Sequence, residues 1–173
     1  MAEKRLSGSG GYWEVLEELA DPTVIKQFND DACAAACGEM LLIDRGCQSI
    51  SQKGIARCAG GVPMEIATLA LALNQLGNLP GRWIGAPIGI DGVTDEELLR
   101  VLMRTGSWAA GFWEDGAPIG HVVMVDGFDE WGRVLIRDPW GLQRSSMQGV
   151  RYKMIIDAFL DVWSRQAVYF VKL

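Results

Sequence analysis

The order of sequence patterns along the chain predicts an α+β fold, with an N-terminal helical half packed on a C-terminal antiparallel β-sheet. Up to residue 106, segments rich in Ala and Leu carry the signals that start and end helices. After that point, short apolar runs bounded by turn residues follow one another, a pattern typical of antiparallel strands. The 173 residues, 49% of them hydrophobic, are enough for one domain with a sizeable core.

The first residues differ in composition from the rest of the chain. Residues 1–11 end in the run SGSGG, which is the composition of a flexible linker. We therefore place a single domain at residues 12–173. Residues 12–20 are predicted to form a short amphipathic helix, which the Asp-Pro pair after it ends.

The helix predicted from Cys33 to about Arg45 carries the first residue that suggests chemistry. Asp30 and Asp31 precede it as candidate caps, and Gly46 follows as a stop. A sulfur in the first turn lies near unpaired backbone N–H groups and the positive end of the helix dipole, which favour a thiolate. Cys33 is therefore a candidate nucleophile, although a cysteine taken alone is more often a buried core residue.

Three further helices and one short strand are predicted in the first half. The helices cover residues 49–58, 63–75 and 94–106, and a capping box (TDEE) opens the last of them. Pro at the start of the second helix fits the first helical position. Residues 77–92 contain five Gly, so we expect a loop around one short strand at residues 83–84.

The second half alternates strands and turns. Strands are predicted at residues 108–113, 122–126, 134–137, 150–154 and 167–171, with one helix at residues 156–163. A hairpin between the second and third strands, turning near Asp129, would place His121 and Asp138 close to opposite one another. Asp138 can then orient the imidazole while the other ring nitrogen faces Cys33. A lone histidine beside an apolar strand is otherwise usually a satisfied core or edge residue.

Composition excludes several classes of partner and cofactor. The net charge of −6 argues against nucleic acid or an anionic membrane, and no apolar run is long enough to span a bilayer. The four cysteines are not spaced as Cys-x-x-Cys pairs, so we expect them reduced, in a cytosol. A zinc site built from them and His121 fits no common zinc module, and no cofactor is expected.

Taken together, the candidate residues resemble the papain superfamily of cysteine peptidases. Gln27 lies six residues before Cys33, and a His and then an Asp follow on adjacent predicted strands. The runs GHVVMVDGFD and RDPWG are more similar to one branch. That branch comprises the bacterial peptidases that remove double-glycine leaders and the papain-like domains of polymorphic toxins and effectors. The similarity spans residues 23–171.

The resemblance implies a fold, a set of roles and a reaction. Cys33 would be the nucleophile, His121 the general base and acid, Asp138 the residue that orients it, and Gln27 the donor to the oxyanion. The chain departs from the leader-peptidase pattern at Ala34, where Gly is usual, and it carries no transporter segment. A toxin or effector domain therefore fits better than a role in peptide export.

The expected activity is cleavage of a protein or peptide by a Cys-His-Asp triad, in the reducing cytosol of a target cell. Delivery as the C-terminal domain of a secreted protein, and an inhibitor or immunity protein as partner, fit a toxin. Two alternatives remain open. The same groups could deamidate glutamine or transfer an acyl group as transglutaminases do, or the chain could be a catalytically silent module that binds a peptide.

Overall fold

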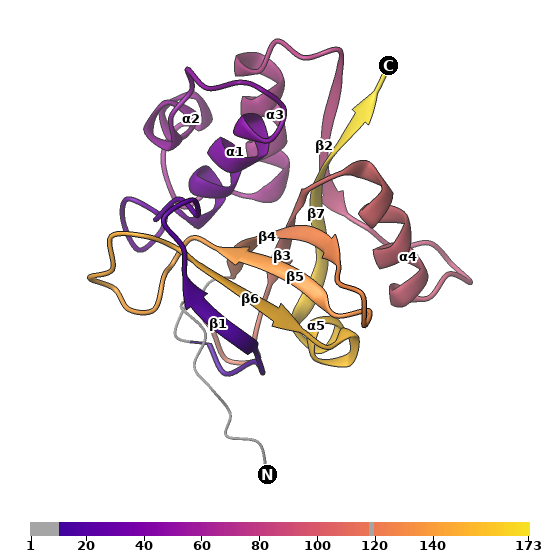
Figure 1. Cartoon of the computed structure of the whole chain (residues 1–173). Helices are drawn as coiled ribbons and strands as arrows, with labels where there is room; N and C mark the ends of the chain where they lie inside the picture. Colours follow the sequence, from indigo (N-terminus) through magenta and orange to yellow (C-terminus); the bar gives the residue numbers. More distant parts are fainter. Residues whose placement is uncertain (1–10, 118–119) are drawn as a thin grey trace.

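The computed structural model describes residues 11–117 and 120–173 and contains a seven-stranded antiparallel sheet. The strand order is β1-β6-β5-β4-β3-β7-β2, so the two strands from the first half of the chain form its two edges (Figure 1). The strands are β1 (Leu16–Ala20), β2 (Gly81–Pro87), β3 (Trp108–Phe112), β4 (His121–Phe128), β5 (Val134–Asp138), β6 (Val150–Met154) and β7 (Trp163–Lys172).

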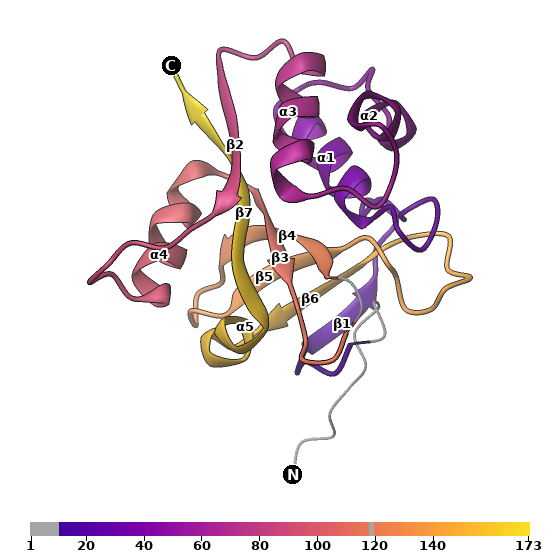
Figure 2. The ribbon, with the colours of Figure 1, turned by 180° about the vertical axis from the view of Figure 1, so that it is seen from behind.

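The helices cover both faces of this sheet. They are α1 (Cys33–Ile43), α2 (Gln52–Ala59), α3 (Ile66–Leu76), α4 (Asp95–Leu102) and α5 (Ile156–Val162), with a 3-10 turn, η1 (Met103–Thr105), after α4. The first three helices form one group, and α4 and α5 lie away from it (Figure 2). The α+β prediction, with N-terminal helices packed on an antiparallel sheet, is therefore confirmed.

Two apolar cores follow from the alternation of side chains along the central strands. Val122 and Met124 of β4 face the core that α1, α2 and α3 build, whereas Val123 and Val125 face the core that contains α4 and α5. All four side chains are buried. Because residues 122–125 of β4 are buried on both faces, they form a continuous apolar run directly after His121.

The helix predicted at residues 12–20 is wrong. Trp13 and Val15 are buried while the residues between and beside them are exposed, so burial alternates with a period of two. Leu16–Ala20 then pairs with β6 as an edge strand. Helix propensity is a weak preference, and the free edge of β6 overrides it here. The predicted linker at residues 1–11 lies, apart from Gly11, outside the described residues.

Helix boundaries also differ from prediction. α2 begins at Gln52 with Ser51 at its N-cap, three residues after the predicted start at residue 49. α3 begins at Ile66 with Glu65 at its N-cap, three residues after the predicted start at Pro63. Ala32, not an aspartate, is the N-cap of α1, and no side chain caps that helix. The capping box at Thr94 is confirmed, with bonds in both directions between Thr94 and Glu97.

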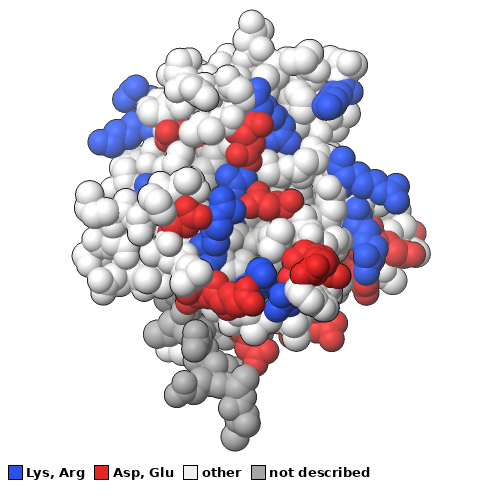
Figure 3. Space-filling model, in the orientation of Figure 1, with Lys and Arg blue, Asp and Glu red and all other residues white. Residues whose placement is uncertain are grey.

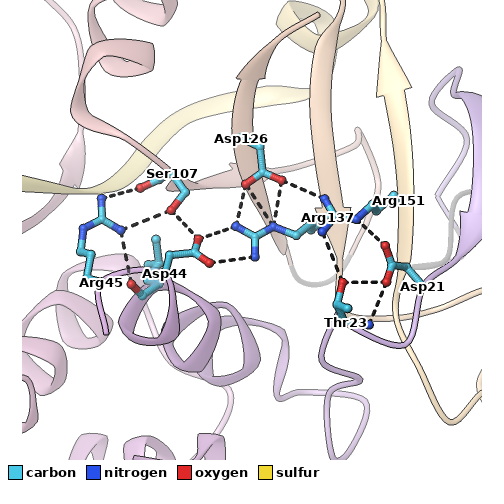
Figure 4. Close-up of polar contacts among 9 residues, drawn as sticks. Asp21, Thr23, Asp44, Arg45, Ser107, Asp126, Arg137 and Arg151 are labelled. Atoms are coloured by element: carbon cyan, nitrogen blue, oxygen red, sulfur yellow. Dashed lines mark hydrogen bonds and ion pairs between the residues drawn. The ribbon is translucent and has the colours of Figure 1, made fainter. Parts of the chain in front are cut away.

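An ion network around the buried Arg137 fastens the end of α1 to the sheet (Figure 4). The Arg137 guanidinium of β5 donates to the carboxylates of Asp44, directly after α1, and of Asp126 on β4. Asp126 also accepts from Arg151, and Ser107 donates to Asp44. Basic and acidic side chains alternate across this face of the molecule (Figure 3). The network therefore fixes one end of the helix whose other end carries Cys33.

Candidate active site

Cys33 is the first residue of α1, where the backbone N–H groups have no partner within the helix. The residue is 9% exposed, and α1 packs beside β4. No side chain caps the N-terminus of α1. The predicted position of Cys33 in the first helical turn is confirmed. Cys37, one turn further, is fully buried and contacts the Val122 carbonyl at 3.4 Å.

The β4–β5 hairpin brings His121 and Asp138 together, with a register that differs slightly from the prediction. Met124 is opposite Arg137, which places Asp138 opposite Val123 and two residues away from His121. A shift of two residues keeps both side chains on the same face of the sheet. His121 Nε2 lies 2.7 Å from Asp138 Oδ1.

Asp138 is completely buried, and its carboxylate accepts three hydrogen bonds. Besides the bond with His121, the Trp140 backbone N–H donates to Oδ1 at 3.0 Å and the Tyr152 hydroxyl donates to Oδ2 at 2.8 Å. Burial raises the pKa of Asp138, but the His121 charge and these bonds outweigh it and lower the pKa. The carboxylate is therefore held ionised and immobile.

His121 lies between Asp138 and Cys33. Burial lowers the pKa of His121, but the charge and hydrogen bond of Asp138, together with Cys33, raise it from 6.5 to about 10. Because Nε2 is engaged by Asp138, Nδ1 is the ring nitrogen left for Cys33. This arrangement favours the imidazolium form of His121.

A cavity of about 300 Å³ opens over the sulfur and the imidazole. It lies between the segment before α3 and strands β3, β4 and β7. Its lining includes Cys33, His121, Met64, Trp113 and Gln166. Trp113 is 52% exposed, so an aromatic surface borders the cavity. A cavity of this size beside a nucleophile and a base is large enough to hold a short stretch of substrate.

Gln27 does not line this cavity. Its side chain is buried, and Nε2 donates to the carbonyl oxygens of Asn29 at 2.8 Å and Asp30 at 3.2 Å. Gln27 instead borders a second cavity of about 510 Å³, together with Lys26 and Trp140. The role of Gln27 as oxyanion donor therefore stays a prediction, which requires one of its two N–H bonds to be released.

Sequence reasoning missed two residues that contact the predicted groups. Trp13 stacks on the His121 ring with centroids 6.2 Å apart and an angle of 18° between the planes. Its Nε1 donates to the Tyr152 hydroxyl at 3.2 Å. The Trp13 contact has no local signal, because Trp13 precedes His121 by 108 positions. Tyr152 lies only 14 positions after Asp138 on the next strand, so antiparallel pairing of these two predicted strands was the signal for it.

Within residues 11–117 and 120–173, no three His, Cys, Asp or Glu side chains are grouped to hold a metal ion. None of the helices in those ranges has the length and apolar composition that crossing a bilayer requires.

Comparison with known proteins supplies a relative. Over 162 residues the chain is 37% identical to a protein of Escherichia coli O1:K1:H7 named Cysteine protease effector 1. The chain is similar to a bacterial cysteine protease effector. The predicted resemblance to cysteine peptidase domains of effectors is thereby confirmed. The aligned region covers 94% of this chain and 29% of the relative. No protein-family model matches the chain.

Proposed function

We propose that this chain is a papain-like cysteine peptidase that hydrolyses a peptide bond of a protein substrate. The observation that carries the proposal is that Cys33 and His121 line the same open cavity, while the buried Asp138 contacts His121 with 2.7 Å between His121 Nε2 and Asp138 Oδ1. The identity of 37% to a protein named as a cysteine protease supports it.

In the proposed mechanism, the Cys33 thiolate attacks the carbonyl carbon of the scissile bond. The C–N bond of the resulting tetrahedral intermediate breaks as His121 gives its proton to the leaving amine, and a thioester remains on the sulfur. His121 then takes a proton from water, which attacks the thioester and releases the carboxylic acid and the thiolate. Asp138 holds the imidazole in the orientation that both transfers need.

The oxyanion of each tetrahedral intermediate needs donors in place. The Cys33 backbone N–H is one candidate, because it belongs to the first turn of α1. Gln27 is the other, since the amide precedes the nucleophile at the spacing found in the papain superfamily. Its Nε2 would exchange the Asp30 carbonyl, the longer of its two bonds at 3.2 Å, for the oxyanion.

The setting we propose is the cytosol of a target cell. The relative is named as an effector, and the four cysteines are all free thiols. We further propose that an inhibitor protein covers the Cys33–His121 cavity in the producing cell. Because the chain carries a net charge of −6, a basic inhibitor would associate faster at low salt than at high salt.

The experiment that tests the function compares wild type with Cys33→Ala in a bacterial lysate. Newly formed protein N-termini are mapped by mass spectrometry. Cys58→Ala, which removes a half-buried thiol elsewhere on the chain, is the matched control. We expect new termini with wild type and Cys58→Ala, and none with Cys33→Ala.

Other outcomes select other functions. Release of ammonia or cross-linking of substrates that depends on Cys33, without new termini, would replace the peptidase by a deamidase or a transglutaminase. Capture of a partner by wild type and Cys33→Ala alike, with no covalent change in that partner, would indicate a silent binding module.

A further inference from the structure

A chain of contacts continues beyond the triad to the N-terminal segment. It runs from His121 to Asp138, from Asp138 Oδ2 to the Tyr152 hydroxyl at 2.8 Å, and from that hydroxyl to Trp13 Nε1 at 3.2 Å. The Trp13 ring then returns to His121 as a stacking partner. The four side chains therefore form a closed loop of contacts around the acid–imidazole pair.

Tyr152 is placed to act on Asp138. The residue is 2% exposed, and β6 pairs with β5 so that Val150 is opposite Asp138, two residues away from Tyr152 on the same face. Burial and the Asp138 charge raise the pKa of Tyr152 well above its ordinary value, so the phenol keeps its proton and donates it. A buried carboxylate without this donor would be less stable in its ionised form.

Trp13 is placed to act on both partners. Its N–H fills the acceptor position of the Tyr152 oxygen, which leaves the phenolic hydrogen directed at Asp138. Its ring covers a face of the His121 imidazole and packs edge-on against Phe112, with centroids 5.3 Å apart. Trp13 is 5% exposed, so the indole keeps water from that side of the imidazole.

We propose that Trp13 and Tyr152 are positioning residues of the active site, which hold Asp138 ionised and fix the plane of the His121 ring. This inference rests on the proposed function, because positioning has meaning only if Cys33 and His121 react. The segment from Gly11 to Val15 places the Trp13 indole over the His121 imidazole. The N-terminal segment therefore contributes a residue to the proposed active site.

A purely structural role for both residues is the competing explanation, because both lie in the second core. The pH dependence of reactivity separates the two roles. Alkylation requires the thiolate, which a neighbouring imidazolium favours, and Asp138 stabilises that imidazolium only while its carboxylate is ionised. The hydrogen bond from Tyr152 lowers the pKa of Asp138. The titratable groups that interact with Asp138 or with Tyr152 are His121 of β4, Lys26 and Cys37 on the helical side, and Glu18 of β1.

The experiment measures the rate of Cys33 alkylation by iodoacetamide against pH, a probe that needs no identified substrate. Tyr152→Phe keeps the ring and removes only the hydroxyl. We expect the acidic limb to move to higher pH and the rate on that limb to fall about tenfold, because a hydrogen bond to a charged group is lost. Tyr169→Phe, a partly buried tyrosine on β7, is the matched control and should not change the profile.

Trp13→Phe and the double variant Trp13→Phe/Tyr152→Phe test whether Trp13 acts on Asp138 through Tyr152. Trp13→Phe keeps an aromatic ring and removes the N–H, so we expect a smaller shift in the same direction. Because the Trp13 N–H acts through the Tyr152 hydroxyl, the double variant should lose little more than Tyr152→Phe alone. Full additivity of the two losses would show that the residues act independently and would overturn the proposed linkage.

The outcomes also separate this inference from the proposed function. If wild-type Cys33 reacts no faster than Cys58 at acidic pH, the thiolate–imidazolium pair is absent, and the proposed function fails with it. If wild-type Cys33 reacts fast and Tyr152→Phe has an unchanged profile, with only a lower melting temperature, the proposed function stands and Tyr152 is structural. Either result rejects the positioning role.

Discussion

Arg137 and Asp138 are neighbours on β5, both buried and both charged, yet they serve opposite faces of the sheet. Arg137 faces α1 and is paired with Asp44 and Asp126. Asp138 faces the other core and is paired with His121 and Tyr152. Alternation along one strand therefore separates a charge that joins two parts of the fold from a charge that orients the base in the proposed mechanism.

The partners explain why the two charges differ in role. Burial lowers the pKa of Arg137, but its two carboxylate partners raise it, and Arg137 is charged at any pH that leaves the protein folded. Asp138 is paired with an imidazole that borders an open cavity and can exchange its proton. In the proposed mechanism the buried charge of Asp138 has a function because its partner, His121, can change protonation state and contact the substrate.

Among the residues grouped with Asp138, the largest expected loss of activity comes from replacing Cys33 or His121, the groups that react in the proposed mechanism. Cys33→Ala and His121→Ala should each lower activity by on the order of 10⁴-fold or more, with the fold intact by circular dichroism. No second histidine exists in the chain to replace His121. If His121→Ala remained active, His121 would not be the base, and Asp138 would then have no base to orient.

The largest expected effect on the Arg137 side is on stability. Arg137→Met removes the buried guanidinium from Asp44 and Asp126, which keep Ser107 and Arg151 as partners, and we expect a loss of about 3 kcal/mol in the free energy of unfolding. Urea denaturation measures it, with Arg144→Gln, which breaks an exposed pair with Asp30, as a control that should change little. The folded Arg137→Met molecules should keep Cys33 reactive. If Arg137→Met lost Cys33 reactivity but kept its stability, Arg137 would serve the active site rather than the fold.

Removal of the Asp138 carboxylate should cost less activity than removal of Cys33 or His121. We expect Asp138→Ala to lose on the order of 10²-fold, because a residue that orients the base transfers no proton itself. Rates of the three variants on one substrate decide this. Equal losses in all three would indicate that Asp138 is needed for the fold of the site.

A smaller effect concerns stability against pH. The pKa of His121 is raised from 6.5 to about 10 in the folded state, so its protonated form stabilises the fold fully below pH 6.5. As the pH rises from 6.5 to 10, the unfolded state releases this proton first and the stabilisation is lost. Denaturation of wild type and His121→Gln across this range should therefore show a declining difference in stability. A constant difference would contradict the raised pKa.

The sequence was sufficient to predict the groups whose spacing is local. Cys33 follows from helix signals around it, and the pairing of His121 with Asp138 follows from the length of one hairpin, although a bulge between Val125 and Gly127 changes its register. Order along the chain also predicted helices on an antiparallel sheet. These features depend on neighbours within about 20 residues, which short sequence patterns describe.

Two of the missed features depend on contacts between distant segments. Trp13 falls in the short amphipathic helix predicted at residues 12–20, and only the free edge of β6 decides for a strand there. Arg137 was predicted as an ordinary strand residue, since its partner Asp44 lies 93 positions away. Pairings at such separations are set by topology, which the chain order does not specify.

Competition among the four cysteines for a short pulse of iodoacetamide at neutral pH, followed by peptide mapping, tests the central claim most directly. Cys33 should be labelled first and alone, because it combines a helix N-terminus with an imidazole that Asp138 holds in place. Cys47 and Cys58 are more exposed than Cys33, so exposure alone would favour them. Labelling of Cys47 or Cys58 before Cys33 would contradict the assignment of Cys33 as the nucleophile.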